Sequence, residues 1–206
     1  MLTLYITRHG ETVWNTQKRM QGWKDSPLTE RGRHNAFSLG ERLAHIPFKA
    51  VYSSPSGRTK ETASLINGER EIPIFYDVNL REVNLGEWEG KTQTLIKEVD
   101  AESNGHFWNQ PHLYTPASGE TFEKVKERLL NFLEQIKREH LSGNILIVTH
   151  SVAIKSLYLI FKNKPIELLW NPPFIHDTSL SIVEVSNDGF SILLEGDTSH
   201  RNLMTK

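Results

Sequence analysis

The sequence contains no cysteine, which excludes disulfide bonds, a thiolate nucleophile and thiolate metal ligands. It also contains no long hydrophobic run. The longest, residues 145–148 and 157–161, are far shorter than the roughly 20 residues that a membrane-spanning helix needs. Nine histidines are present, but they form no HExxH or His-x-His motif, and the glycines form neither a Walker nor a dinucleotide-binding motif. We therefore expect a chain that needs no metal and no nucleotide cofactor.

The chain also lacks a charge excess, because 24 Lys and Arg residues stand against 25 Asp and Glu residues. Without such an excess no overall field attracts nucleic acid or an anionic membrane, so an anion site must come from a local cluster. The first residues show no basic start followed by the apolar core of a signal peptide. We expect a cytoplasmic protein whose partners are neither nucleic acid nor membrane.

Strand and helix patterns alternate along the chain, which is typical of a layered α/β fold. A chain of 206 residues is the size of one domain, and we assign residues 1–206 to it. The predicted strands are residues 4–7, 50–53, 145–149, 180–185 and 191–194. The pair Asp188-Gly189 is a hairpin signal between the last two strands. The sheet should therefore be mostly parallel with an antiparallel edge.

The spacing of hydrophobic residues predicts helices over residues 28–43, with Thr29 as N-cap, and over residues 152–161. Within residues 119–139 the spacings of three and four form a single apolar stripe. This stripe consists of Phe122, Val125, Leu129, Phe132, Leu133 and Ile136. Residues 77–116 are irregular and too many for a plain loop, so we expect either a lid or a small helical insertion there.

Polar side chains follow three of the predicted parallel strands. They are Arg8 and His9; Ser53, Ser54 and Arg58; and Thr149, His150 and Ser151. Ligands of an open α/β sheet bind beyond the carboxyl ends of its parallel strands, so these side chains should meet at one edge. A lone histidine at a strand end is usually structural. Two imidazoles and two guanidiniums together would repel one another, which favours a bound anion between them.

The anion is most simply a phosphoryl group, because arginine matches phosphate oxygens in a bidentate way and a helix N-terminus adds N–H donors. A carboxylate can use the same arginines, but four cationic or imidazole groups exceed what one carboxylate needs. With no thiol and no metal motif, the available nucleophile is an imidazole, and its attack would leave a phosphohistidine. A carboxyl group must then protonate the leaving alcohol and later activate water. The candidates are Glu11, Glu61, Glu82 and Glu87, and chemistry alone does not choose among them.

Four motifs in this order resemble the histidine phosphatase superfamily, in its phosphoglycerate-mutase-like branch. They are Arg8-His9-Gly10-Glu11-Thr12, Arg58 after Ser-Ser-Pro, Leu80-Arg81-Glu82 before Gly-Glu-Trp-Glu-Gly, and Val148-Thr149-His150. The resemblance covers nearly the whole chain. It implies a three-layer α/β/α sandwich with a mostly parallel mixed sheet, an insertion at about 77–116 over the active site, and no metal or nucleotide cofactor.

Carried over by position, the resemblance implies a role for each matching residue. His9 would be the nucleophile and His150 the second histidine of the phosphate pocket. Arg8 and Arg58 would clamp the phosphoryl group, and Glu82 would donate the proton. Ser151 stands where the family often has glycine. The remaining positions on the substrate side are Asn15, Gln21, Gly22 and Ser151.

The expected substrates are small phosphorylated metabolites. The sequence lacks the basic, hydroxyl-rich segment that the resemblance associates with true phosphoglycerate mutases. In its place stand Trp88, Phe107, Trp108, Leu113 and Tyr114, which either form an apolar wall for varied leaving groups or only pack the insertion onto the core. We therefore predict a metal-independent phosphomonoester hydrolase of broad specificity. The alternatives are a dedicated phosphatase for α-ribazole phosphate or fructose 2,6-bisphosphate, a cofactor-dependent phosphoglycerate mutase, and a phospho-ligand-binding module without activity.

Overall fold

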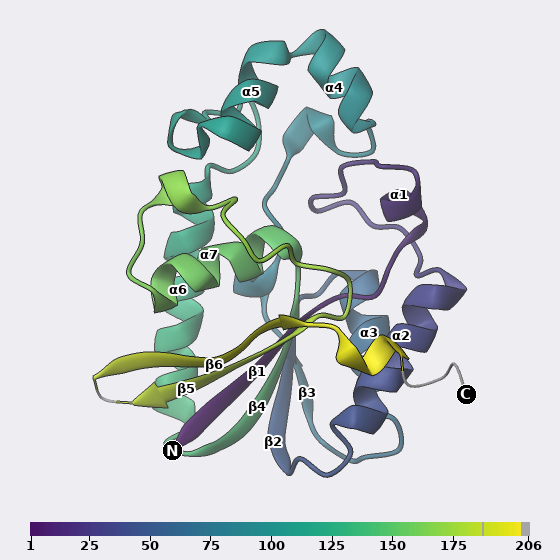
Figure 1. Cartoon of the computed structure of the whole chain (residues 1–206), viewed down its shortest axis with the longest axis vertical. Helices are drawn as coiled ribbons and strands as arrows, with labels where there is room; N and C mark the ends of the chain where they lie inside the picture. The colour runs from purple at the N-terminus through teal and green to yellow at the C-terminus, as the bar shows by residue number, and fades with distance from the viewer. Residues whose placement is uncertain (187, 203–206) are drawn as a thin grey trace.

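A six-stranded mixed sheet forms the centre of the molecule, in the order β3-β2-β4-β1-β5-β6 (Figure 1). The structure, a computed structural model, describes residues 1–186 and 188–202. The strands are β1 (Leu2–Arg8), β2 (Phe48–Ser53), β3 (Ile74–Tyr76), β4 (Gly143–Thr149), β5 (Leu180–Ser186) and β6 (Gly189–Asp197). Strands β3, β2, β4 and β1 run parallel, while β5 and β6 add an antiparallel edge. This confirms the mostly parallel mixed sheet.

Helices cover both faces of this sheet and complete an α/β/α sandwich (Figure 1). They are α1 (Val13–Thr16), α2 (Glu30–Arg42), α3 (Gly57–Asn67), α4 (Gln93–Val99), α5 (Ala101–Asn109), α6 (Phe122–Glu139) and α7 (Ser151–Phe161). Helices α2 and α3 lie on one face and α6 and α7 on the other. In β4, Ile145 and Ile147 pack toward α6 and α7, while Leu146 and Val148 join the opposite core. This burial on both faces explains why the strand is continuously hydrophobic.

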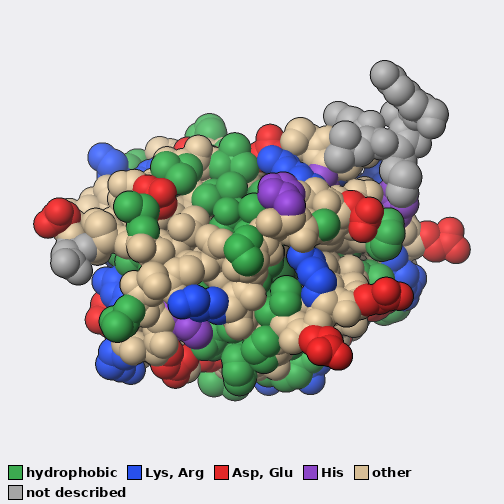
Figure 2. Space-filling model, turned by 90° about the horizontal axis from the view of Figure 1, so that it is seen from below, with side chains coloured by type: hydrophobic (Ala, Val, Ile, Leu, Met, Phe, Trp, Pro, Cys, Tyr) green, Lys and Arg blue, Asp and Glu red, His purple; other side chains and the backbone are tan. Residues whose placement is uncertain are grey.

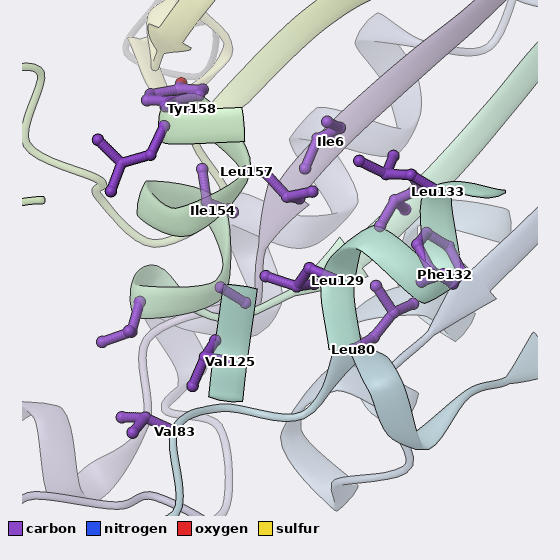
Figure 3. Close-up of a cluster of buried hydrophobic side chains, with 14 of the residues drawn as sticks. Ile6, Leu80, Val83, Val125, Leu129, Phe132, Leu133, Ile154, Leu157 and Tyr158 are labelled. Carbon is purple, nitrogen blue, oxygen red and sulfur yellow. The ribbon is translucent and has the colours of Figure 1, made fainter. Parts of the chain in front are cut away.

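The apolar stripe of α6 forms much of the larger core, as predicted. None of its six residues is more than 2% exposed. In Figure 3, Leu129 and Leu133 of this stripe lie close to Leu157 of α7 and Ile6 of β1. Burial of each such side chain contributes about 1.5–3 kcal/mol, so this contact fixes α6 on the sheet. Thr121 begins the helix by accepting a hydrogen bond from the N–H of Lys124 at 3.3 Å.

Residues 77–116 form a small helical insertion that lies above the carboxyl ends of the parallel strands (Figure 1). Besides α4 and α5 it contains the 3-10 helices η1 (Val78–Leu80), η2 (Gly86–Trp88) and η3 (Pro111–Leu113). Further 3-10 helices are η4 (Ile166–Leu168) and η5 (Ser199–Asn202). The insertion is joined to the core through Leu80, Trp88 and Phe107, which are buried together with α6. It is thus packed on the sandwich rather than held by its ends alone.

The predicted elements are present, and one strand was missed. Thr29 caps α2 by accepting from the N–H of Gly32 at 3.0 Å, as expected. Strand β3 was not predicted, because it has three residues at a sheet edge and its side chains are half-buried or exposed. The predicted hairpin at Asp188-Gly189 joins β5 to β6, and the preceding Asn187 lies outside the described residues.

The surface opposite α4 and α5 is seen in Figure 2, where side chains of both charge signs are interspersed among the described residues. This mixture agrees with the nearly balanced composition. In the described part of the chain, no helix has both the length and the apolar character required to cross a membrane.

Candidate active site

His9 directly follows β1, and its backbone N–H donates to the carbonyl of Thr149 at the end of β4, 2.9 Å away. The side chain is 2% exposed. Its ring Nδ1 lies 2.8 Å from the carbonyl oxygen of Gly10. A carbonyl only accepts, so Nδ1 carries the proton and Nε2 keeps its lone pair. This tautomer has a nitrogen that can attack an electrophile.

Gly10 makes the turn after His9 possible by close backbone packing. Its N–H donates to Thr62 Oγ1 at 2.9 Å. A Cβ atom at this position would lie 2.6 Å from the carbonyl oxygen of Gly32 in α2. The backbone of this turn therefore lies directly against α2, and any side chain at Gly10 would push His9 away from it.

His150 directly follows β4 at the N-cap position of α7 and is fully buried beside His9, with ring centroids 5.3 Å apart. Arg58 Nη2 lies 3.1 Å from its Nδ1, and Ser54 Oγ lies 2.8 Å from its Nε2. Arginine has only donors, so Nδ1 accepts and Nε2–H donates to Ser54. The ends of three strands thus meet as predicted: His9 follows β1, Ser54 and Arg58 follow β2, and His150 follows β4.

Both imidazoles are neutral at neutral pH. Burial lowers the pKa of His9 well below 6.5, and the positive charges of Arg58 and Arg8 lower it further. The pKa of His150 is also lowered well below 6.5 by burial, then by Arg58 and by His9. A neutral imidazole is the form with nucleophilic character, so His9 Nε2 does not need a base to remove a proton.

Arg58 connects the imidazoles to the segment at residues 22–25. The side chain is fully buried at the start of α3 and forms an ion pair with Asp25 at 2.8 Å. It also donates to the carbonyl oxygens of Lys24 at 2.7 Å and Gly22 at 2.8 Å. Its Nε is buried with no partner among the described residues. Arg58 therefore positions this segment as well as contributing a positive charge.

Arg8 and Asn15 complete the group of donors around His9. Arg8 donates to the carbonyl of Ile175 at 2.8 Å, and its Nε is buried with no partner in the described part of the chain. The side-chain oxygen of Asn15 accepts from the N–H of Thr12 at 3.0 Å, in a capping box that starts α1. This bond orients the amide so that its nitrogen is left to donate. Arg8 and Asn15 both line the cavity described below.

Glu82 is the one carboxylate among the four candidates that lines this cavity. It is 8% exposed. Its oxygens accept from the N–H of Val83 at 3.0 Å, the N–H of Val152 at 3.3 Å and the hydroxyl of Ser151 at 3.4 Å. These bonds hold it against the first turn of α7. Of the other candidates, Glu11 pairs with Arg31, Glu61 pairs with Arg33 and Glu87 is exposed.

Gln21 and Gly22, which the resemblance placed on the substrate side, line the same cavity. Gly22 has φ +55°, and Gln21 Oε1 is buried without a partner among the described residues. Glu89, in the insertion, accepts from the N–H of Trp23 at 2.8 Å and from that of Lys24 at 3.1 Å. A residue of the insertion thus orders this segment, a contact that no motif indicated.

One cavity of about 460 Å³ joins these side chains. At one end lie His9, Arg8, Asn15, Gln21, Gly22, Arg58, Glu82 and Ser151. Much of the remaining wall is apolar and includes Met20, Val83, Leu85, Phe107, Trp108, Val152, Trp170, Pro172, Phe174 and Ile175. Arg19, Gln93 and Lys155 add polar groups. His150 contacts the cavity end through Arg58 and His9.

For five residues of the insertion the sequence left two readings open, a cavity wall or packing onto the core, and the structure separates them. Phe107 and Trp108 line the cavity. Trp88 and Tyr114 do not line it, since they are buried against Phe107 in the core of the insertion, with ring centroids 5.7 and 5.0 Å from it. Leu113 is 47% exposed and also lies off the cavity.

The missed part of the wall comes from residues 170–175, which follow α7. Trp170 and Phe174 lie there in a segment without periodicity or motif, so only the packing of Trp170 on Phe107 brings it to the cavity. Lys155 could have been found from the sequence, because it lies on the helix predicted over residues 152–161 and follows Ser151 by four residues, a spacing that puts both on one face of α7. In the described residues, no three His, Asp or Glu side chains form a group that could hold a metal ion.

Comparisons of the sequence and of the structure with known proteins indicate the same family. Residues 4–198 match the model of the histidine phosphatase superfamily (branch 1). Phosphoserine phosphatase 1 of Hydrogenobacter thermophilus is 28% identical over 83% of this chain and 81% of its own length. The protein named probable phosphoglycerate mutase GpmB of Salmonella arizonae is 30% identical over 97% of this chain and 95% of its own length. The solved structure of Bacillus stearothermophilus YhfR has a TM-score of 0.94 and 48% identity, covering 98% of this chain and all of that one.

Proposed function

This chain belongs to the histidine phosphatase superfamily (branch 1), a class of phosphatases with a histidine nucleophile, and we propose that it hydrolyses small phosphomonoesters through a phosphohistidine on His9. The observation that carries the proposal is the meeting of two buried neutral imidazoles, two guanidiniums and one carboxylate at the end of one cavity. Within the described residues Arg8 forms no ion pair and Arg58 forms one, with Asp25, and both have a buried Nε without a partner, so an anion between them would complete their hydrogen bonds.

In the first step, His9 Nε2 attacks phosphorus and the bond from phosphorus to the ester oxygen breaks. The guanidiniums of Arg8 and Arg58 and the amide of Asn15 hold the phosphoryl oxygens as their charge is redistributed. Protonated Glu82 gives its proton to the departing oxygen, which leaves as an alcohol. The products of this step are the alcohol, the Glu82 carboxylate and phosphorylated His9.

In the second step, the Glu82 carboxylate takes a proton from water, and the water oxygen attacks the phosphorus of phosphohistidine. Phosphate leaves, His9 recovers its neutral form, and Glu82 is again protonated. The hydrogen bonds from Val83, Val152 and Ser151 hold this carboxyl at the cavity, where one group can serve both steps.

The composition of the cavity favours hydrolysis of varied esters over phosphoryl transfer between positions of one substrate. A mutase must retain a doubly phosphorylated intermediate, which calls for several cations beyond the first phosphate. Here the wall beyond His9 is formed largely by apolar groups such as Phe107, Trp108, Trp170 and Ile175. An apolar wall accepts leaving groups by shape and hydrophobic contact, with little demand for a particular polar pattern.

The proposal is tested by phosphate release from a panel of aryl, alkyl and sugar phosphates, measured with and without a chelator. We expect turnover of several chemical classes, unaffected by the chelator and lost in His9→Ala. His34→Ala is the matched control, because His34 is exposed on α2. Isomerisation of 3-phosphoglycerate faster than hydrolysis would favour the mutase, and a single ester hydrolysed far faster than all others would show a dedicated phosphatase.

A further inference from the structure

Lys155 is a buried cation of the cavity that the two steps above do not use. It lies on α7, one turn beyond Ser151, and is 6% exposed. Ser151, Val152 and Lys155 are separated by spacings that place them on one helix face, and all three line the cavity. At 1.5 Å per residue, the backbone of Lys155 is about 7.5 Å along the helix axis from that of His150. The backbone of Lys155 thus lies one helical turn further along α7 than that of Ser151.

The ammonium group of Lys155 is poorly satisfied by the protein. Within the described residues it donates one hydrogen bond, to the carbonyl of Asn171, and pairs with no carboxylate. Glu195 attracts it from a distance but forms its ion pair with Lys162. Burial and the charge of Lys162 lower the pKa of Lys155 to about 8. Two of its three N–H donors thus have no partner in the described part of the chain and are free for an acceptor that enters the cavity.

Much of the cavity wall around Lys155 is apolar. Trp170 and Pro172 flank Asn171, whose carbonyl accepts from Lys155, and both line the cavity. Trp170 packs on Trp108 and Phe107 with ring centroids 4.7 and 5.3 Å apart, and its indole N–H donates to the carbonyl of Phe107. Arg19, the other cation of this wall, already donates to the carbonyl of Gly90 at 2.7 Å and to Gln17 at 2.9 Å, so Lys155 is the cation with fewer acceptors among the described residues.

We propose that Lys155 is a specificity-determining residue that binds a carboxylate on the leaving alcohol of the substrate. The inference rests on the proposed function of the cavity. It names a substrate class, phosphomonoesters whose alcohol has an apolar body and one terminal carboxylate. One ammonium balances one negative charge, whereas a second phosphate dianion would stay half-compensated in apolar surroundings. A charge-assisted hydrogen bond in such a site strengthens binding about tenfold to a hundredfold.

The test uses pairs of esters that differ only in this charge. The probes are the phosphate esters of para-hydroxybenzoate, para-hydroxyphenylacetate and para-hydroxyphenylpropanoate, each compared with its primary amide. The series varies the spacing between phosphorus and the carboxylate, and each amide keeps the shape without the charge. The doubly phosphorylated comparison is para-hydroxybenzyl phosphate with a second phosphate on its phenolic oxygen.

The variants are Lys155→Met, which keeps the length without the charge, and Lys155→Arg, which keeps the charge. Lys164→Met is the matched control, since Lys164 is exposed beyond the end of α7. For at least one acid, we expect Lys155→Met to lower kcat/KM about tenfold to a hundredfold, mainly through KM, and to leave its amide unchanged. Lys155→Arg should retain most of the preference.

The proposal is overturned if Lys155→Met lowers kcat/KM equally for acid and amide, which would make Lys155 purely structural, or if neither changes. It is also overturned if the bisphosphate suffers the larger loss, because the bound group would then be a phosphate. Hydrolysis of the amides by the unaltered enzyme tests the proposed function separately. If no ester is hydrolysed, that function fails and the inference about Lys155 fails with it.

Discussion

Replacement of Glu89 by glutamine should impair catalysis from outside the cavity. The Glu89 carboxylate accepts three backbone N–H bonds, from Trp23 at 2.8 Å, Lys24 at 3.1 Å and Leu85 at 3.2 Å. These bonds join the segment that includes Gln21 to the loop that contains Glu82. Glu89 itself is absent from the cavity wall, so the replacement perturbs the placement of binding groups and not their identity.

The expected loss of activity in Glu89→Gln follows from the number of backbone N–H bonds that a glutamine can still accept. Glu89 Oε1 accepts from Trp23 and Leu85, while Oε2 accepts only from Lys24. A glutamine can keep the first two bonds, but its NH2 group must then face the N–H of Lys24. One charge-assisted bond is lost and two donors are opposed, at a cost of about 1–3 kcal/mol. If half of this cost appears in the transition state, kcat/KM falls about twofold to thirteenfold.

Steady-state hydrolysis of an aryl phosphate measures this effect, with thermal unfolding recorded for each variant. Glu87→Gln is the control, because Glu87 is exposed two residues earlier. Glu89→Gln should lower kcat/KM while the enzyme stays folded at the assay temperature. Activity equal to that of Glu87→Gln would refute the argument that these three hydrogen bonds order the substrate-facing segment.

Three further changes test separate parts of the structure. Trp108→Ala should raise KM for an aryl phosphate about twofold to tenfold and leave that for glycerol phosphate unchanged, because an aromatic contact is lost. Leu129→Ala should lower the free energy of unfolding by about 2–5 kcal/mol in urea titrations with unchanged kcat/KM, since Leu129 is fully buried away from the cavity. Burial lowers the pKa of His200 to about 4, so from pH 6.5 down to about 4 the unfolded chain binds a proton that the folded chain does not. Acidification across this window should lower the free energy of unfolding of the unaltered protein more than that of His200→Gln. An equal decrease in both proteins would show that His200 does not contribute to the acid sensitivity.

The sequence was sufficient to predict the architecture and the meeting of the strand-end residues at one cavity. The strand and helix patterns around Arg8, Arg58 and His150 are strong, and strand topology alone requires their ends to meet. Strand β3 was missed because a three-residue edge strand with exposed side chains has no hydrophobic pattern. The hydrophobic pattern therefore predicts strands and helices that are buried, and it fails for a short strand that is not.

The distal wall could not be predicted for a different reason. Trp88 and Phe107 are both aromatic residues of the insertion, and nothing in the sequence separates them. Trp88 is buried in the core of the insertion only, whereas Phe107 is buried there and also lines the cavity. The difference arises from how α5 packs on Trp170, some sixty residues later, which no local rule describes. Glu89 likewise gained its partners through tertiary packing.

Trapping of the phosphorylated enzyme tests the central claim most directly. The enzyme is mixed with an aryl phosphate, quenched in alkali within one turnover, digested and analysed by mass spectrometry for acid-labile phosphate. We predict that the phosphate is found on the peptide containing His9, is present at the same level in His34→Ala and is absent in His9→Ala. Phosphate on another residue, or hydrolysis by His9→Ala at the unaltered rate, would contradict the assignment of His9 as the nucleophile.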